Sequence, residues 1–447
     1  MMKYYDVCIV GGGLAGISTA YYLLKYGVKN VILFEASRNV GGLLRSMVIN
    51  GYTFDIGGSH IIFSKDSSTL KEILNILNGN YVRHRRNSKI YIDGRYVKYP
   101  FENGLKDLPP EKRFECLRDI IEIYIKRLKG EVKEPRNFLE WLYYVFGNCI
   151  VNTYLKPYNE KLWKIDLSEV TLEWVQGRVP TPPIEDVMKA AVGLDTEGYK
   201  HQLNFYYPLR GGIESLIKSL INEISGKVMI KVKSRVRRVR LDDNDLIVEV
   251  SDDEVRCKYV VYTAPLNESA NILKDVLGGM SRELSLLRSV PLIVTSIGFG
   301  GSSLPYHWVY VPQKDIIFHR FAFLSNYSPL NAPKNCTALI TETSLSNQDE
   351  LRSLNEYTFL RKVVEGLEYL RIVKSEKDIE VYNITKWFNA YVIYDRVRSE
   401  VLSKAKSKLL ENNIILHGRF GLWEYLNMDA VLSKSQSIAR FILSKSE

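Results

Sequence analysis

The feature that constrains this chain most is a glycine pattern near its amino end. Val7 to Val10 is a short apolar run rich in β-branched residues, which predicts a buried strand. A helical pattern begins at Ile17, so Gly11, Gly13 and Gly16 form G-x-G-x-x-G at a strand-to-helix junction. The first glycine permits the tight turn, the second lets a pyrophosphate approach the backbone, and the third lets helix and strand pack closely. The diphosphate of a dinucleotide is therefore expected at the helix N-terminus.

The residues after this turn extend the same interpretation. A second apolar run at 31–34 predicts another strand, and it ends at Glu35. An acid at this position suits the paired hydroxyl groups of a ribose. Because strand, glycines, helix, strand and acid follow in order, the sequence predicts a dinucleotide-binding domain and disfavours a glycine-rich turn without a ligand.

Two further glycine pairs follow in the first part of the chain. Gly42 and Arg45 lie in the stretch RNVGGLLRS, which is suited to wrap a second part of the dinucleotide phosphate. Gly57 and Gly58 lie in the stretch YTFDIGGSHIIFS, where the backbone can pass close to a flat ring system. His60 lies directly beyond them. Both loops are therefore expected to contact the dinucleotide.

The remaining patterns predict an α/β protein whose Rossmann-type domain is interrupted twice. Apolar residues recur at helical spacing between about 109 and 172. Strand patterns at 228–239, 246–250 and 259–262 return the chain to the dinucleotide-binding domain. Val236 lies in the first of these strands, and its backbone groups are expected to bind an adenine. The alternative is that they only pair with a neighbouring strand. Further strands are expected at 292–298, 308–311, 316–323 and 338–343.

These patterns define an expected domain organisation. The dinucleotide-binding domain has three parts, at 1–80, 207–268 and 405–447. A helical domain occupies 100–200 and an antiparallel sheet domain occupies 269–400. The final part holds one strand and one helix, which close the dinucleotide-binding domain.

Charge and cysteine content narrow the functional classes. The formal net charge of +10 over 447 residues fits an anionic ligand, and the chain has no nucleic-acid recognition motif or long basic tract. The five cysteines are scattered, odd in number and without metal-ligand spacing, which predicts reduced thiols and no metal site. No uncharged apolar run approaches the ~18 residues of a membrane span. A strand begins almost at Met1, so we expect a cytoplasmic protein without signal peptide or stable membrane insertion.

Four later segments resemble the UDP-galactopyranose mutase family, and its eukaryotic-type branch more than the common bacterial one. They are PYNEKLW at 157–163, GRVPTPP at 177–183, FAFLSNYSP at 321–329 and HGRFGLWEYLNMD at 417–429. The glycine turn alone does not separate this family from the flavin amine oxidases, in whose superfamily it lies. The resemblance implies a Rossmann-type FAD-binding domain, a helical domain and an antiparallel sheet domain that meet at a cleft.

The resemblance also implies an activity. Members of this family interconvert UDP-galactopyranose and UDP-galactofuranose without net redox change, using reduced FAD. N5 of the reduced flavin attacks the anomeric carbon, UDP leaves, the sugar ring opens and recloses, and UDP recombines. The protein then mainly positions the substrate and stabilises the leaving diphosphate. The expected partners are a UDP-sugar and NAD(P)H or another reductant, with a homo-oligomer left open as an alternative to a monomer.

Site residues follow from positions that match the family. Arg178 and Arg320 match its diphosphate-binding arginines, against the alternative that they form structural salt bridges. His60 matches a histidine whose loop faces the reactive flavin edge, and Arg419 is expected beside the flavin. Trp308 either stacks on uracil or fills the core. The expected substrate-binding residues are Asn159, Trp163, Trp308, Tyr310, Tyr391, Tyr425 and Asn427.

Two other functions stay open from the sequence. One is an FAD-dependent oxidase of the amine oxidase or protoporphyrinogen oxidase type. Those enzymes commonly carry an acid after the glycine of the last strand, where this chain has Arg419, and a positive charge there suits an anionic substrate instead. The other is a non-catalytic protein that binds flavin or a nucleotide sugar, which needs the glycine turn but not two converging arginines.

Overall fold

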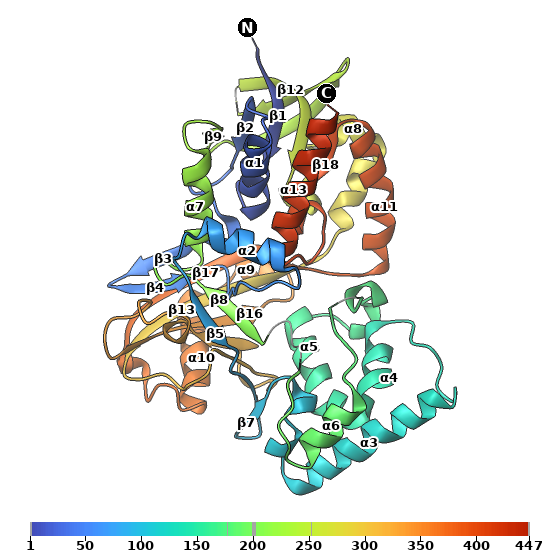
Figure 1. The fold of residues 1–447 in the computed structure, drawn as a ribbon, viewed down its shortest axis with the longest axis vertical. Coiled ribbons are helices and arrows are strands. Elements are labelled where there is room, and N and C mark those ends of the chain that lie inside the picture. Colours follow the sequence, from blue (N-terminus) through green and yellow to red (C-terminus); the bar gives the residue numbers. More distant parts are fainter. Residues whose placement is uncertain (1, 177, 199–202, 252, 446–447) are drawn as a thin grey trace.

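The computed structural model describes residues 2–176, 178–198, 203–251 and 253–445. Two seven-stranded sheets, two short strand pairs and a helical region make up the molecule (Figure 1). The α/β class expected from the sequence is confirmed. Gly177, the first residue of the GRVPTPP segment, lies outside the described residues.

The first sheet contains the amino-terminal strand and has the order β10-β11-β12-β1-β2-β9, with β18 paired to β12. Its strands are β1 (Lys3–Val10), β2 (Val31–Phe34), β9 (Met229–Lys231), β10 (Val236–Asp242), β11 (Asp245–Val250), β12 (Asp253–Tyr262) and β18 (Ile414–Leu416). β1 pairs in parallel with β2 and with β12, and β12 pairs in parallel with β18. The run 7–10 is fully buried, as expected for a central parallel strand with both faces covered.

Helices cover this sheet in Figure 1, where both chain ends also lie. They include α1 (Leu14–Lys25), α2 (Ser67–Ile76), α7 (Glu214–Ile224), α8 (Lys274–Leu277), α11 (Arg396–Glu411) and α13 (Met428–Ser444). α1 packs against α7 and α13. A Cβ at Gly16 would lie 2.0 Å from the carbonyl oxygen of Gly11, so only glycine permits this approach of α1 to β1.

The single strand expected at 228–239 is wrong. β9 and β10 are separate, because the chain turns between them at Lys233, whose φ is 54°. The backbone N–H groups of Lys233 and Ser234 donate to the carbonyl oxygens of Ser37 and Glu35, at 2.8 Å each. These bonds direct the turn to the end of β2, beside the glycine loop.

The second sheet has the order β17-β13-β16-β15-β14-β6-β7. Its strands are β6 (Ser88–Ile92), β7 (Arg95–Lys98), β13 (Ser289–Gly300), β14 (Trp308–Tyr310), β15 (Arg320–Phe323), β16 (Cys336–Ser344) and β17 (Ile379–Val392). Phe321 and Phe323 join a core with α10 (Glu356–Tyr369), near the short α9 (Gln348–Arg352), whereas Ala322 faces the main core. This alternation of period two turns Arg320 away from α10.

The strand expected at 316–323 begins only at Arg320. Ile316 and Phe318 are buried, but they reach the core with α10 from a turn, where both approach Gly366 of that helix. The apolar residues at these two positions therefore pack against a helix and do not indicate a strand. The two short strand pairs are β3 (Ser46–Ile49) with β4 (Tyr52–Asp55) and β5 (Val82–Arg85) with β8 (Asn204–Tyr207).

The helical region projects from the rest of the molecule (Figure 1). It contains α3 (Pro110–Leu128), α4 (Phe138–Ile150), a π-helical turn at Val151–Leu155, α5 (Lys156–Trp163) and α6 (Ile184–Ala191). Gly147 has a φ of 72° inside α4, and a Cβ there would lie 2.9 Å from the carboxylate of Asp119 in α3. The glycine thus lets α4 bend closely against α3 before the chain continues into α5.

Cys116 and Cys149 form a disulfide, so the expectation of reduced thiols is wrong for this pair. The two residues are 33 positions apart in sequence, and their spacing carries no signal of its own. The packing of α3 against α4 brings their Cα atoms to 4.9 Å. Cys8, Cys257 and Cys336 are free.

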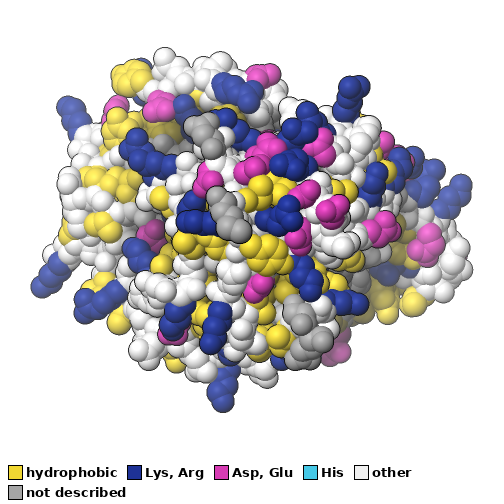
Figure 2. All heavy atoms as spheres, turned by 90° about the horizontal axis from the view of Figure 1, so that it is seen from above, with side chains coloured by type: hydrophobic (Ala, Val, Ile, Leu, Met, Phe, Trp, Pro, Cys, Tyr) yellow, Lys and Arg dark blue, Asp and Glu magenta, His cyan; other side chains and the backbone are white. Residues whose placement is uncertain are grey.

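The surface mixes both signs of charge. On the face drawn in Figure 2, Lys and Arg side chains alternate with Asp and Glu, with apolar side chains between them. The positive net charge is therefore spread over this face without a continuous basic patch. Within the described part of the chain, no helix combines the length and apolar character needed to cross a membrane.

Removing the disulfide is expected to destabilise the helical region. Replacing both Cys116 and Cys149 by serine should lower the free energy of unfolding by about 3 kcal/mol, because the cross-link restricts the unfolded chain. Chemical denaturation followed by circular dichroism measures the change. A thiol reductant should destabilise the wild type and leave the double variant unchanged; equal sensitivity of both proteins would contradict a role for this bond.

Candidate functional site

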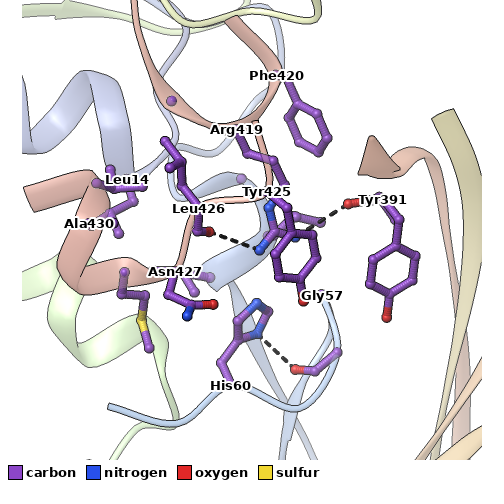
Figure 3. A pocket seen from close by; sticks show the side chains of 18 of the residues that line it. Leu14, Gly57, His60, Tyr391, Arg419, Phe420, Tyr425, Leu426, Asn427 and Ala430 are labelled. Atoms are coloured by element: carbon purple, nitrogen blue, oxygen red, sulfur yellow. Dashed lines mark hydrogen bonds between the residues drawn. The ribbon is translucent and has the colours of Figure 1, made fainter. Parts of the chain in front are cut away.

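One large cavity of about 1110 Å³ lies between the first sheet, the second sheet and the helical region. Most residues singled out from the sequence line it, from the glycine turn at one end to the second sheet at the other. They are Gly11, Gly13, Glu35, Gly42, Gly57, Gly58, His60, Asn159, Trp163, Arg178, Val236, Trp308, Tyr310, Arg320, Tyr391, Arg419, Tyr425 and Asn427. Figure 3 shows part of this lining around His60 and Arg419.

The end of the cavity at the glycine turn has the form of an anion site. A Cβ at Gly13 would have no other atom within 4 Å, which leaves open space before α1. No side chain of the described residues caps the N-terminus of α1, and its first turn contains no acid. The first N–H groups of this helix are therefore available to phosphate oxygens.

Glu35 is fixed beside this turn. Its two carboxylate oxygens accept hydrogen bonds from the backbone N–H groups of Gly12 and Ser37, both at 2.7 Å. Each oxygen keeps a lone pair that can accept a ribose hydroxyl. Val236 lines the cavity near this end, at the start of β10 where the pairing with β11 is irregular.

Two glycine loops close around the same end. The N–H of Gly41 donates to the carbonyl oxygen of Gly12 at 2.7 Å, and Gly42 lies against Gly13. A Cβ at Gly57 would lie 1.9 Å from the carbonyl oxygen of Leu43, so the second loop packs on the first with no room for a side chain. Arg45 is not among the lining residues, because its guanidinium stacks 5.4 Å above the Trp387 ring.

At the other end, Arg320 forms a two-pronged ion pair with Glu342. Nε and Nη2 of Arg320 donate to the two carboxylate oxygens, at 2.9 and 2.6 Å. The two residues stand directly opposite each other on β15 and β16. Burial is the largest single effect on the pKa of Glu342, whose side chain is 1% exposed, and it raises this pKa. The charges of Arg320 and His319 and the hydrogen bonds from Arg320 and Ser59 together outweigh burial and hold the pKa below its ordinary value.

Glu342 also joins the neighbouring elements. It accepts hydrogen bonds from the backbone N–H of Ser59, at 2.9 Å, and from the hydroxyl of Tyr391, at 3.1 Å. A Cβ at Gly58 would lie 3.3 Å from the Glu342 carboxylate, so a side chain at this position would crowd the acid. Sequence reasoning missed Glu342, although an acid inside the expected strand at 338–343 was a signal that a buried cation stands opposite.

Arg178 reaches the same cavity from the helical region. Its Nη2 donates to the carbonyl oxygen of Tyr425 at 2.7 Å, and its guanidinium lies 4.9 Å from the rings of Trp174 and Tyr394. No carboxylate of the described chain lies within ion-pair distance of it, and its buried Nη1 lacks a partner there. The Arg178 guanidinium also lies 5.6 Å from the Tyr425 ring, and this ring stacks on that of Tyr391 at 6.0 Å. Because the Tyr391 hydroxyl donates to Glu342, a continuous series of contacts joins Arg178 to Glu342.

Figure 3 places His60, Arg419 and Tyr425 together at the centre of the cavity. Arg419, in α12 (Gly418–Gly421), donates to the carbonyl oxygens of Leu426 and Ala390 and lies 4.3 Å from the Tyr425 ring. Burial, followed by the charge of Arg419, lowers the pKa of His60 to about 4. His60 is therefore neutral at physiological pH, and its Nδ1–H donates to Gly58 at 2.9 Å, which leaves Nε2 as an acceptor.

The remaining predicted residues differ in what they can offer. Trp163 and Trp308 are buried, and each indole N–H lacks a partner among the described residues. Asn159 donates its amide to the carbonyl oxygen of Leu155 at 2.7 Å, which leaves its own carbonyl oxygen for a ligand. Asn427 stands at the N-terminus of α13 and appears in Figure 3 beside His60.

Comparisons with known proteins place this site in a family. Residues 14–392 match the family described as flavin containing amine oxidoreductase. A probable flavin-containing monoamine oxidase A of Dictyostelium discoideum is 31% identical over 132 residues, which are 28% of this chain and 27% of that protein. Protoporphyrinogen oxidase 2 of Arabidopsis thaliana, chloroplastic/mitochondrial, is 22% identical over 450 residues, which cover 89% of this chain and 85% of that one.

A crystal structure of reduced UDP-galactopyranose mutase has a TM-score of 0.89 to this chain at 24% identity, covering 99% of this chain and 96% of the other. At this level of identity the likeness establishes a shared fold.

The chain belongs to the flavin-containing amine oxidoreductase family, because the matching region spans most of its length. FAD is accordingly its cofactor. The open cradle at Gly13, the uncapped α1 and the fixed carboxylate of Glu35 fit the diphosphate and ribose of this dinucleotide.

A methyl group at Gly13 should block this cradle without disturbing the fold. Gly13 has a φ of −74°, which alanine adopts readily, and a Cβ there meets no atom within 4 Å. We expect Gly13→Ala to fold normally and to lose most of its bound FAD, measured by flavin absorbance of the purified protein. Gly279→Ala, at an equally open glycine outside the cavity lining, is the control. Full flavin content in Gly13→Ala would contradict this position of the diphosphate.

The Arg320–Glu342 pair should show an asymmetric cost when one partner is removed. Arg320→Ala leaves a carboxylate that is 1% exposed and is expected to lower stability by about 3–5 kcal/mol. Glu342→Ala should cost less, because Arg320 is 22% exposed toward the cavity and can be solvated there. Thermal denaturation of both single variants and the double variant measures the coupling. If the stability losses of the two single variants add up to that of the double variant, the ion pair contributes nothing to stability.

Proposed function

We propose that this protein is a flavin-dependent mutase that interconverts UDP-galactopyranose and UDP-galactofuranose. The observation that carries the proposal is the pair of guanidinium groups, Arg178 and Arg320, on the lining of one cavity. The Nη1 of Arg178 is buried and has no partner in the described chain, and the Arg320–Glu342 pair uses only Nε and Nη2 of Arg320; in both arginines Nη2 is already held. Fixed cations with a free donor suit the diphosphate of a nucleotide sugar.

Two arginines on the cavity lining that form no ion pair with the described residues support an anionic substrate. Glu342 neutralises Arg320 in part, whereas Arg178 and Arg419 form no ion pair with the described residues. Both of these arginines are held by carbonyl oxygens and aromatic rings, which orient a guanidinium without cancelling its charge. The charges of these two arginines favour a departing diphosphate beside them and disfavour the ammonium group of an amine substrate there.

The division of roles follows from this arrangement. When bound, reduced FAD would supply the nucleophile for the anomeric carbon of the sugar. Arg178 and Arg320 would bind the departing diphosphate, and the hydroxyl groups of Tyr310, Tyr391 and Tyr425 would add hydrogen bonds to it. Neutral His60 would keep the loop at Gly58 in place and offer Nε2 as an acceptor to the substrate. Asn159, Trp163 and Asn427 would line the sugar, and NAD(P)H or another reductant would provide the electrons.

An FAD-dependent oxidase is the second candidate. The support for this candidate is that several relatives in sequence are named as oxidases. One of them, the Arabidopsis protoporphyrinogen oxidase, aligns with 89% of this chain. An oxidase must reduce its flavin with the substrate, whereas the proposed mutase releases its product with the flavin in the same redox state. Without O2 to reoxidise the flavin, an oxidase would end its first turnover with reduced flavin, whereas the mutase leaves the flavin as it was. The redox state of the flavin under anaerobic conditions therefore distinguishes the two.

Activity with chemically reduced enzyme is the direct test. The protein reduced with dithionite under anaerobic conditions should convert UDP-galactofuranose to UDP-galactopyranose, followed by chromatography, while the oxidised protein should not. The flavin should remain reduced throughout, as monitored by absorbance. Absence of conversion in the reduced state, or bleaching of oxidised flavin by an amine or by protoporphyrinogen, would overturn the proposal.

Arg178→Ala should weaken UDP binding roughly tenfold to a hundredfold, because a charged hydrogen bond to a phosphate is lost. Flavin absorbance should not change, since Arg178 contacts neither glycine loop in the described structure. Isothermal titration calorimetry with UDP measures the effect. Arg136→Ala, at an exposed arginine of the same helical region, is the control and should bind UDP like the wild type. Unchanged affinity in Arg178→Ala would remove this residue from the diphosphate site.

A further inference from the structure

A buried lysine joins the helical region to the second sheet. Lys161 lies in α5, which packs against β16 (Figure 1), and its side chain is not part of the cavity lining. Its Nζ donates hydrogen bonds to the backbone carbonyl oxygens of Val311 and Gln313, at 3.0 and 2.6 Å. Both residues follow directly after β14. One amine therefore attaches this helix to the connection between β14 and β15.

The connection that Lys161 holds leads to two of the residues assigned to the diphosphate. The N–H of Val311 donates to the carbonyl oxygen of His319 at 2.8 Å, which closes the connection. The next pair along the two strands is Tyr310 and Arg320, which stand directly opposite each other. A displacement of the connection would therefore displace both of these side chains.

A lysine at this buried position is unfavourable for folding unless it has a specific task. Among the residues that the structure describes, no carboxylate forms an ion pair with Lys161, although the residue is only 9% exposed. Lysine is rarely buried without such a partner, because its ammonium group loses its hydration. The amine lies outside the cavity, so it has no direct contact with a substrate there. Its two hydrogen bonds to the connection are what distinguish it from an apolar side chain.

We propose that Lys161 is a positioning residue that holds the diphosphate-binding strands at a fixed spacing from the helix that lines the sugar. The role rests on the proposed function, which puts the sugar at Asn159 and Trp163 of α5 and the diphosphate at Tyr310 and Arg320. A nucleotide sugar must fit both places at once, whereas UDP needs only the second. An error in their spacing therefore lowers the rate of the isomerisation and leaves the affinity for UDP unchanged.

The charge of the amine changes near neutral pH. Burial, followed by the charge of Lys164, lowers the pKa of Lys161 to about 7, against the opposing effect of Asp315. Below this pH the ammonium group makes charge-assisted hydrogen bonds to the two carbonyl oxygens, and above it the neutral amine makes weaker ones. The hold on the connection is therefore strongest at low pH and weakens as the pH rises through the pKa.

The other ionisable groups around Lys161 come from α5 itself and from the elements next to it. His319 is neutral, because burial lowers its pKa to about 3. Glu342 is held by Arg320. The full set comprises Tyr154 in the π-helical turn, Lys156, Tyr158, Glu160 and Lys164 in or directly after α5, Asp166 and Glu169 in the next turn, Lys314, Asp315 and His319 in the connection, Arg320 on β15 and Glu342 on β16.

Lys161→Met, which keeps the apolar stem and removes the amine, separates the rate from UDP binding. For the dithionite-reduced holoenzyme at about pH 6, we expect kcat with UDP-galactofuranose to fall roughly tenfold to a hundredfold. Calorimetry with UDP on the oxidised holoenzyme should give the wild-type affinity, and flavin absorbance should be normal. Lys156→Met is the control and should match the wild type in all three measurements, because this lysine of α5 has a side chain that is 38% exposed.

The pH dependence of kcat gives a second measurement, which does not require Lys161→Met to fold. Between about pH 6 and 8.5, kcat of the wild type should fall severalfold as the amine loses its proton. Lys161→Arg stays charged over this range and should lack the fall. Lys164→Met, at an exposed position, should show the fall at higher pH, because the charge that lowers the pKa of Lys161 is gone. Titration of the coenzyme is common to all these proteins and cancels in the comparison.

The outcomes separate the two proposals. If the reduced wild type converts UDP-galactofuranose and Lys161→Met does so equally fast, or if the variant loses UDP affinity and kcat by the same factor, Lys161 does not set the spacing, while the proposed function stands. If Lys161→Met does not retain flavin, the profile of Lys164→Met decides, and a fall at the wild-type pH overturns the role of Lys161. If the reduced wild type converts no substrate at any pH, the proposed function fails, and the role of Lys161 fails with it.

Discussion

The ion pair between Arg320 and Glu342 is the interaction on which the site depends. It connects two neighbouring strands of the second sheet and presents both side chains to the cavity. Two elements outside those strands use the same carboxylate, through the N–H of Ser59 and the hydroxyl of Tyr391. A charge pair this buried persists only when further hydrogen bonds satisfy it, and here those bonds come from the loop that follows Gly58 and from β17. This residue pair thus holds together the strands and the loop that form the end of the cavity at the second sheet.

The two ends of the cavity are built from different parts of the fold. The glycine turn, α1 and Glu35 form the part of the cavity common to a dinucleotide-binding fold. The opposite end is built from the second sheet and the helical region, and it contains the arginines and tyrosines that we propose bind the substrate. Fold and family therefore identify the cofactor, while the substrate must be argued from the side chains at the far end.

The glycine turn was predictable because its signal is local: strand, glycines, helix and acid succeed one another within 35 residues. The placement of Arg178 and Arg320 in one cavity also agrees with the segments recognised in the sequence. Glu342, in contrast, becomes meaningful only once the register of β15 and β16 is known. The Cys116–Cys149 bond and the break between β9 and β10 have the same origin, since helix packing and a turn held by distant carbonyl oxygens decide them. Arg45 shows the opposite case, a plausible phosphate ligand that instead stacks on Trp387.

The order of the first sheet has a consequence for how the chain matures. β1 lies between β2, which follows at once, and β12, which is made more than two hundred residues later, and β12 in turn receives β18 near the carboxyl end. A nascent chain therefore holds β1 half-paired until β12, more than two hundred residues later, has been made. Such long-range pairing slows folding and exposes an apolar edge. The cavity lining also includes residues from Gly418 to Ser433, so the coenzyme site is complete only after these have been made, and cofactor capture follows the synthesis of both sheets.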